Sequence, residues 1–473
     1  MIERRASQEN PVDLIDTGQF LTAEEQFAER RTDDPMEMVV RSEVATYFGR
    51  TNDGAALLEQ VATRISELEV AARFSLAKGR LALGLSDYEQ AESQLQTAYY
   101  FYRFLNDSFG LSQSLLSLAH LARSRGDLDR ATTMLGTALE GVKGRTSKKA
   151  EFLRGLIAAG QAAAAADRGD VEQATEQYSE AARLLKGNER GRFYALSLVG
   201  TADLRCALGE FQESIELYKE ANTVFERYDL KVELAESQLK LADALLKLKR
   251  FERSEKLADD SRDLRRGDPA GESAALTMMA QVSLLQNELE EAFTRATNSV
   301  ELADQGNSIK ARVRARVILG KVRDAQREFK LAAEILREAA ELARSSNPSV
   351  ENRRLELEAV VYLAEAYHNT DTRAGRGELA RASELLNGIE DVWLGDEYNR
   401  ISAKYEEQIT FTDDNRLVFD GNQLPRWQEA KRTLEGFLLR NALRQTNNSL
   451  TRAARKLGVS KVHVHNLKKK HNL

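Results

Sequence analysis

A pattern of large and small residues recurs along this chain, mostly at intervals of 38 to 43 residues. Each copy starts at a large apolar residue just after a turn, with small residues three and ten positions later and usually a large one at seven. Copies start at Tyr88, Leu128, Val171, Phe211, Phe251, Leu289 and Phe329, and Leu379 closes the series. Because spacings of three and four place side chains on one helical face, each copy predicts an amphipathic helix.

A further small residue stands nine positions before each of the first seven starts: Gly79, Ala119, Ala162, Ala202, Ala242, Ala280 and Gly320. Small side chains allow a preceding antiparallel helix to approach closely. Gly-Asp or Gly-Glu pairs, as at 126–127 and 209–210, suit the end of one helix and the start of the next. The chain therefore predicts stacked two-helix units, with two weaker copies near Phe20 and Gly54.

The repeat resembles the tetratricopeptide repeat in a form with longer helices, over about residues 10 to 390. It lacks the proline that usually ends each unit, and the last unit has an insertion at residues 370–375. The resemblance implies an α-solenoid over residues 1–400 whose first helices line a groove for a protein or peptide partner. The candidate groove residues are His120, Arg123, Asp203, Asp243, Gln281, Lys321 and Asp324. The alternative is that they are ordinary solvated polar positions.

Composition agrees with an all-α chain, because there are only 5 prolines and the aromatic content is 7%. The single cysteine, Cys206, excludes a disulfide within the chain and a cysteine-based zinc site, and it suits a reducing cytoplasm. The start of the chain has no apolar stretch typical of a secretion signal, and no apolar run is long enough to span a membrane. We expect a cytoplasmic protein without a membrane segment or cofactor.

The period ends near residue 400. Residues 409–411 and 416–419 are β-prone and flank the turn-rich tetrapeptide at 412–415, which predicts a short β-hairpin in a connector over residues 401–424.

The final segment, residues 425–473, differs from the rest in charge. It holds 12 basic and 2 acidic residues, whereas the other 424 residues hold 56 basic and 72 acidic ones. An acidic body with a basic end indicates that only the end faces a polyanion. A long helix is predicted from Pro425 to Gln445, with Trp427, Leu434, Phe437, Leu438 and Ala442 on its apolar face.

Two shorter helices are predicted after it. Ser449 suits the start of the second helix, in which Ala453, Ala454 and Leu457 face inward. Gly458 ends that helix, Val459 is expected to fill the core, and Ser460 caps a third helix from Lys461 to His471 with Val464 and Leu467 inward. This order predicts a helix-turn-helix.

The segment from Asn448 to Lys461 resembles the Fis-type helix-turn-helix, with its Ala-Ala pair and its Leu-Gly-Val-Ser turn at the end of the chain. The resemblance implies double-stranded DNA as a partner and a homodimer through this domain. Asn448 and Ser449 replace the usual Gly-Asn, and Lys468 stands where the family has a leucine. The candidate DNA-binding residues are Ser449, Thr451, Arg452, Ser460, Lys461, His463, Asn466, Lys469 and Lys470.

These features favour a DNA-binding transcriptional regulator whose helical array binds a protein or peptide partner. The alternative is a scaffold that does not bind DNA, in which the lysines at 468–470 only aid solubility. An enzyme is not expected, since the sequence has neither a Walker-type phosphate loop nor a nucleophile-base pair. His463, His465 and His471 have no acidic or thiol partner close in sequence, so no metal site is predicted.

Overall fold

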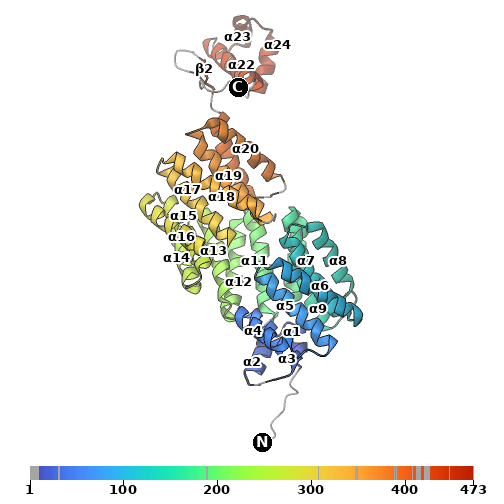
Figure 1. Cartoon of the computed structure of the whole chain (residues 1–473). Coiled ribbons are helices and arrows are strands. Elements are labelled where there is room, and N and C mark those ends of the chain that lie inside the picture. Colours follow the sequence, from blue (N-terminus) through green and yellow to red (C-terminus); the bar gives the residue numbers. More distant parts are fainter. Residues whose placement is uncertain are drawn as a thin grey trace.

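The computed structural model describes residues 10–471, apart from 30, 31, 188, 189, 307, 347–349, 388, 390, 407, 408, 412–416, 420–426 and 447. It is an all-helical solenoid followed by a short hairpin and three further helices (Figure 1).

The solenoid opens with two short helices, α1 (Pro11–Asp16) and α2 (Phe20–Glu29), followed by the pair α3 (Pro35–Tyr47) and α4 (Thr51–Ala62). Eight longer pairs follow: α5 (Leu68–Gly84) and α6 (Tyr88–Phe104), α7 (Ser108–Ser124) and α8 (Leu128–Glu140), α9 (Lys148–Arg168) and α10 (Val171–Leu185), α11 (Gly191–Ala207) and α12 (Phe211–Arg227), α13 (Lys231–Lys247) and α14 (Phe251–Leu264), α15 (Pro269–Leu285) and α16 (Leu289–Gln305), α17 (Ile309–Ala325) and α18 (Phe329–Ser345), α19 (Val350–His368) and α20 (Thr372–Leu386). The helix α21 (Val392–Glu406) ends the array.

The second helix of each pair from α6 to α18 begins at the residue that the repeat predicts. The last pair differs, because α20 begins at Thr372 and not at Leu379. Asp371 caps it by accepting hydrogen bonds from the backbone of Arg373 and Ala374, so most of the presumed insertion forms an additional first turn of the helix.

The turn inside each of these pairs has one backbone conformation. Ser86, Gly126, Gly169, Gly209, Lys249, Asn287 and Arg327 all have φ between 57° and 81°. Glycine reaches this left-handed region without strain and other residues do so at a cost, so the geometry belongs to the repeat and not to the residue that happens to occupy it.

Each pair is held together where its small residue meets the large residue of its partner helix. A Cβ added to Gly79 would lie 2.7 Å from Leu95 Cγ, and one added to Gly320 would lie 2.5 Å from Leu336 Cγ. Both leucines are fully buried, as is Ala242 in the equivalent position of another unit. Removing a side chain from one helix therefore makes room for the side chain of the other.

The first helices of successive units also contact one another, as α13 does α15 and α15 does α17. They form the inner layer of the superhelix, and the second helices form the outer layer. At its far end α21 packs on α19 and α20 and buries Leu394, Ile401 and Tyr405. The array thus extends to residue 406, slightly beyond the boundary at 400 predicted from the loss of period.

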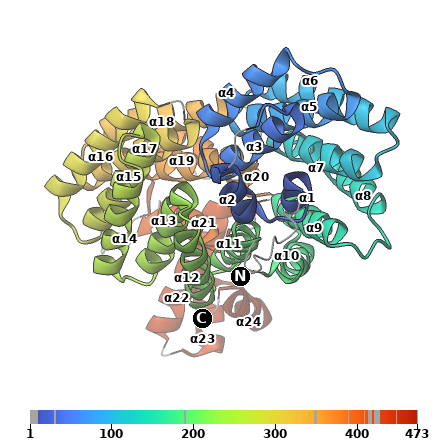
Figure 2. The same ribbon diagram turned by 90° about the horizontal axis from the view of Figure 1, so that it is seen from below.

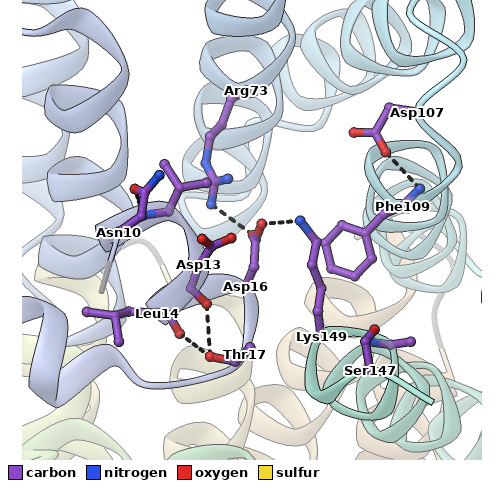
Figure 3. A network of polar contacts seen from close by, with 12 residues as sticks. Asn10, Asp13, Leu14, Asp16, Thr17, Arg73, Asp107, Phe109, Ser147 and Lys149 are labelled. Atoms are coloured by element: carbon purple, nitrogen blue, oxygen red, sulfur yellow. Dashed lines mark hydrogen bonds and ion pairs between the residues drawn. The ribbon is translucent and has the colours of Figure 1, made fainter. Parts of the chain in front are cut away.

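The N-terminal helices α1 and α2 lie toward the inside of the first superhelical turn (Figure 2). Asp16, at the end of α1, is only 2% exposed. Its carboxylate lies 3.1 Å from a guanidinium nitrogen of Arg73 on α5 and 2.5 Å from Lys149 Nζ on α9 (Figure 3). Desolvation would raise the pKa of Asp16, but these two cations keep it below the ordinary value.

Aromatic contacts close the same turn. Phe20 of α2 stacks on Tyr47 of α3 with ring centroids 4.1 Å apart, and both rings lie against Phe193 of α11. Helices far apart in the sequence are therefore joined through α1 and α2, and the first half of the array forms a closed turn.

We expect Asp16→Asn to lower the free energy of unfolding by about 3 kcal/mol, because it leaves the buried Arg73 and the partly exposed Lys149 short of a negative charge. Urea denaturation at neutral pH measures this loss. Because the pKa of Asp16 is lowered in the fold, the advantage of the wild type should fade as pH falls through and below about 4.

The matched control is Asp13→Asn on the exposed face of the same helix. We expect it to change the stability by less than about 0.5 kcal/mol. Equal effects of the two substitutions would contradict the assigned role of Asp16.

Candidate functional site

The chain after the array contains two short strands and three helices. Strands β1 (Ile409–Phe411) and β2 (Leu417–Phe419) pair antiparallel, with Thr410 opposite Val418, where the sequence predicts a hairpin. The helices are α22 (Trp427–Gln445), α23 (Leu450–Leu457) and α24 (Lys461–Lys470). The predicted turn of the hairpin and Pro425 lie outside the described residues.

The three helices share a small core formed by Leu439, Ala442 and Leu443 of α22, Ala453 and Ala454 of α23, and Val464 and Leu467 of α24. The inward residues of α23 and α24 agree with the prediction. Two other predictions are wrong. Leu434 and Leu438 are 41% and 45% exposed, because the buried stripe of α22 runs through Leu439 and Leu443. Val459 is 36% exposed and lies outside this core.

The geometry between α23 and α24 is that of a tight turn with a capped second helix. Gly458 has a φ of 67° and ends α23 in the left-handed conformation. The Ser460 hydroxyl accepts a hydrogen bond of 3.1 Å from the backbone nitrogen of His463 and so caps α24. Ser449 takes the N-cap position of α23, but its side chain makes no capping hydrogen bond.

The candidate DNA-binding residues lie at the surface of this three-helix unit. Thr451 and Arg452 are exposed on α23, Ser460 is exposed in the turn, and Ser449 is partly exposed. On α24 the exposed residues include Lys461, His463, Asn466, Lys469 and Lys470. An exposed, positively charged helix that follows a tight turn can approach a polyanion without rearrangement.

One of these residues is already engaged. Lys470 Nζ lies 2.8 Å from a carboxylate oxygen of Glu435 on α22, and this contact lowers the pKa of Glu435. His471 packs against Gly436 and has its Nε2 3.8 Å from the same carboxylate. The last turn of α24 is thereby clamped to α22, and we assign Lys470 to this clamp before any contact with phosphate.

The predicted groove residues all lie on first helices of the array, but they fall into separate groups. His120 and Arg123 lie on α7, where Arg123 pairs with Asp167 of α9 at 3.0 Å. Desolvation by the surrounding protein, together with Arg123 and Arg80, lowers the pKa of His120 to about 4.

Asp203 and Asp243 are brought together farther along. Asp203 accepts hydrogen bonds of 2.6 Å from the Tyr218 hydroxyl and from Lys240, and Asp243 pairs with Lys247 at 3.1 Å. Arg354 of α19 pairs with Asp391. Desolvation lowers the pKa of Arg354, but Asp391, Glu358 and, more weakly, Asp243 and Asp203 raise it above its ordinary value.

Lys321 and Asp324 form a third group on α17. Lys321 Nζ lies 4.0 Å from the ring centroid of Tyr362 and 5.8 Å from that of Trp393. Desolvation and the nearby Glu365 raise the pKa of Asp324 to about 6, and its Oδ1 is buried without a hydrogen bond from the described residues. Gln281 of α15 is partly exposed.

The inner face also contains residues that the sequence did not single out. One is Arg354, whose side chain is 46% exposed and pairs with the buried carboxylate of Asp391. Trp393 lies between α13 and α17, with Lys247 Nζ 5.0 Å from its ring centroid. The spacing of Lys240 and Lys247 from Asp243 could have indicated these lysines, whereas no pattern marks Trp393.

No protein-family model and no curated protein matches this sequence. Solved structures do resemble the fold. The apo form of the quorum sensor NprR from B. thuringiensis matches with a TM-score of 0.54 and 16% identity, covering 77% of this chain and 99% of that one. The apo form of RapI matches with a TM-score of 0.50 and 11% identity, covering 78% and 98%.

A structure of NprR in complex with its cognate peptide NprX gives a TM-score of 0.49 and 14% identity, covering 76% of this chain and 100% of that one. At their low identities, the matches to apo NprR and to RapI show the fold alone, which is a tetratricopeptide-like helical solenoid. Within the described residues, no helix has both the length and the apolar character needed to cross a bilayer.

Proposed function

We propose that this chain is a DNA-binding transcriptional regulator in which the last three helices bind double-stranded DNA and the array binds a protein or peptide partner. The observation that carries the DNA-binding part is the geometry of α23 and α24. A left-handed turn at Gly458 and a cap at Ser460 present an exposed basic helix at the end of an otherwise acidic chain.

The charge distribution also favours contact with DNA through the last three helices and not through the array. Lysine and arginine side chains neutralise phosphates, and the acidic remainder of the chain would be repelled by them. Asn466 can hydrogen-bond to a base edge in the major groove, most readily to adenine. Lys461 and Asn466 are therefore the residues whose loss tests the proposal.

We expect the full chain to bind duplex DNA with an affinity that falls steeply as salt rises. Replacing both Lys461 and Asn466 with alanine should weaken binding to selected duplexes by roughly tenfold or more, because a base contact and a phosphate contact are lost. Fluorescence anisotropy over a series of salt concentrations measures both effects, and circular dichroism should show an unchanged fold.

The control is Glu172→Gln on the exposed side of α10, which should leave DNA affinity unchanged. A full chain that ignores duplex DNA even at low salt would leave the scaffold function in place of the regulator.

The exposed stripe of α22 supports self-association through this unit. Leu434 and Leu438 lie four positions apart on a helix whose opposite face fills the core, and both are more than 40% exposed. Pairing two such helices would bury these leucines and would double a small DNA contact.

We expect the full chain to sediment as a dimer, and Leu434→Asp combined with Leu438→Asp to make it a monomer, since each charge would be buried in the pair. Arg440→Ala, an exposed change on the same helix, is the control and should leave the dimer intact. A wild-type chain that is monomeric at the concentrations of the DNA-binding assay would contradict the pairing.

Partner binding is proposed for the inner face of the later units. There Lys321 of α17 lies 5.8 Å from the ring centroid of Trp393 on α21, and Arg354 of α19 pairs with Asp391, two positions before that tryptophan. The fold shared with the quorum sensor NprR agrees with a sensing role for the array.

We expect the immobilised full chain to enrich members of a synthetic short-peptide library, and Arg354→Ala with Lys321→Ala to abolish that enrichment. Glu172→Gln on the outer layer should retain it. Equal enrichment by all three proteins would show that the inner face is not the partner site.

A further inference from the structure

The outward face of α24 contains one apolar residue, Val462, among polar residues of the same helix. Val462, Asn466 and Lys469 follow one another at spacings of four and three, opposite the buried Val464 and Leu467. Val462 is 69% exposed, and among the exposed large apolar residues of the described chain only Phe104 exceeds it.

The core of the three-helix unit does not use this side chain. Val464 and Leu467 provide the contribution of α24 to that core, and the clamp from Glu435 reaches the opposite end of the helix at Lys470. The other exposed apolar residues of the unit are Leu434 and Leu438 on α22 and Val459 in the turn before α24, which is 36% exposed. Val462 therefore has no packing role within the fold, although a polar residue of similar size would be better solvated there.

The position of Val462 indicates what it contacts. It lies in the first turn of α24, the helix that directly follows the tight turn at Gly458. Residues in that position reach base edges when the second helix of a helix-turn-helix enters the major groove. Lys461 and His465 flank it and are exposed, which favours approach to a polyanion and disfavours an apolar protein surface. The apolar feature that a base pair presents in the major groove is the C5-methyl group of thymine.

We propose that Val462 contacts a thymine methyl group and so determines a preference for thymine at one position of each half-site. This inference rests on the proposed DNA-binding function. The valine contributes an apolar contact that lysine, histidine and asparagine cannot make, while Asn466, one turn farther along, reads a neighbouring base.

The test removes the methyl group from the DNA. The full chain first selects duplexes from a pool with 20 randomised base pairs, about two turns of DNA. The selected duplexes are then prepared twice, once with thymine and once with uracil at every thymine position. Uracil pairs identically but lacks the methyl group.

The wild-type chain should bind the uracil form about threefold to fourfold more weakly for each half-site, the effect of leaving one methyl-sized apolar group in water. Val462→Ser should bind both forms equally. Lys469→Ala should bind both forms more weakly and with a smaller salt dependence, but it should keep the difference between them.

A Val462→Ser chain that discriminates thymine from uracil as the wild type does would overturn the inference, as would a wild type that does not discriminate. In both cases binding to the selected duplexes would leave the DNA-binding function standing. If Val462→Ser changed the sedimentation of the free protein, the valine would belong to an interface between copies and the inference would also fail. A chain that selects no duplex at all would remove the proposed function itself.

Discussion

The close approach of two helices at a small residue is the contact on which the rest of this structure depends. Gly320 leaves the space that Leu336 fills, and Gly79 does the same for Leu95. Any side chain added at either glycine would push the pair apart. Because each unit is stacked on the next through its first helix, an error of spacing in one pair would change the curvature of the inner layer. The positions of Arg354, Lys321 and Trp393 relative to one another depend on that curvature.

Contacts at the two ends of the array then fix how its helices are arranged. At the N-terminal end, Asp16 links α1 to both α5 and α9, so the first turn is closed by charge as well as by aromatic packing. At the other end, α21 covers α19 and α20 and brings Trp393 between α13 and α17. Asp203 and Asp243 lie in the units between these ends, and their carboxylates help to raise the pKa of Arg354.

Local features of the fold could be predicted from the sequence, and long-range ones could not. The second helices of the pairs from α6 to α18 begin at the residues that the repeat predicts. The large and small residues that mark each of these helices all lie within about ten positions of its start, so the pattern is local. The prediction of the buried face of α22 is wrong, because Leu434 and Leu438 fit helical spacing as well as Leu439 and Leu443 do. Only packing against α23 and α24 decides between the two stripes. The pairing of Asp16 with Lys149, 133 positions apart, has no sequence signal at all.

The candidate sites divide in the same way. Capping at Ser460 and the left-handed turn at Gly458 follow from residue types, whereas the clamp between Glu435 and Lys470 depends on where α24 ends in space.

The most direct measurement of the central claim is backbone hydrogen exchange of the full chain with and without duplex DNA. The account predicts slower exchange confined to α23, α24 and the turn between them. Protection along the array, or none anywhere in the presence of duplex, would contradict it.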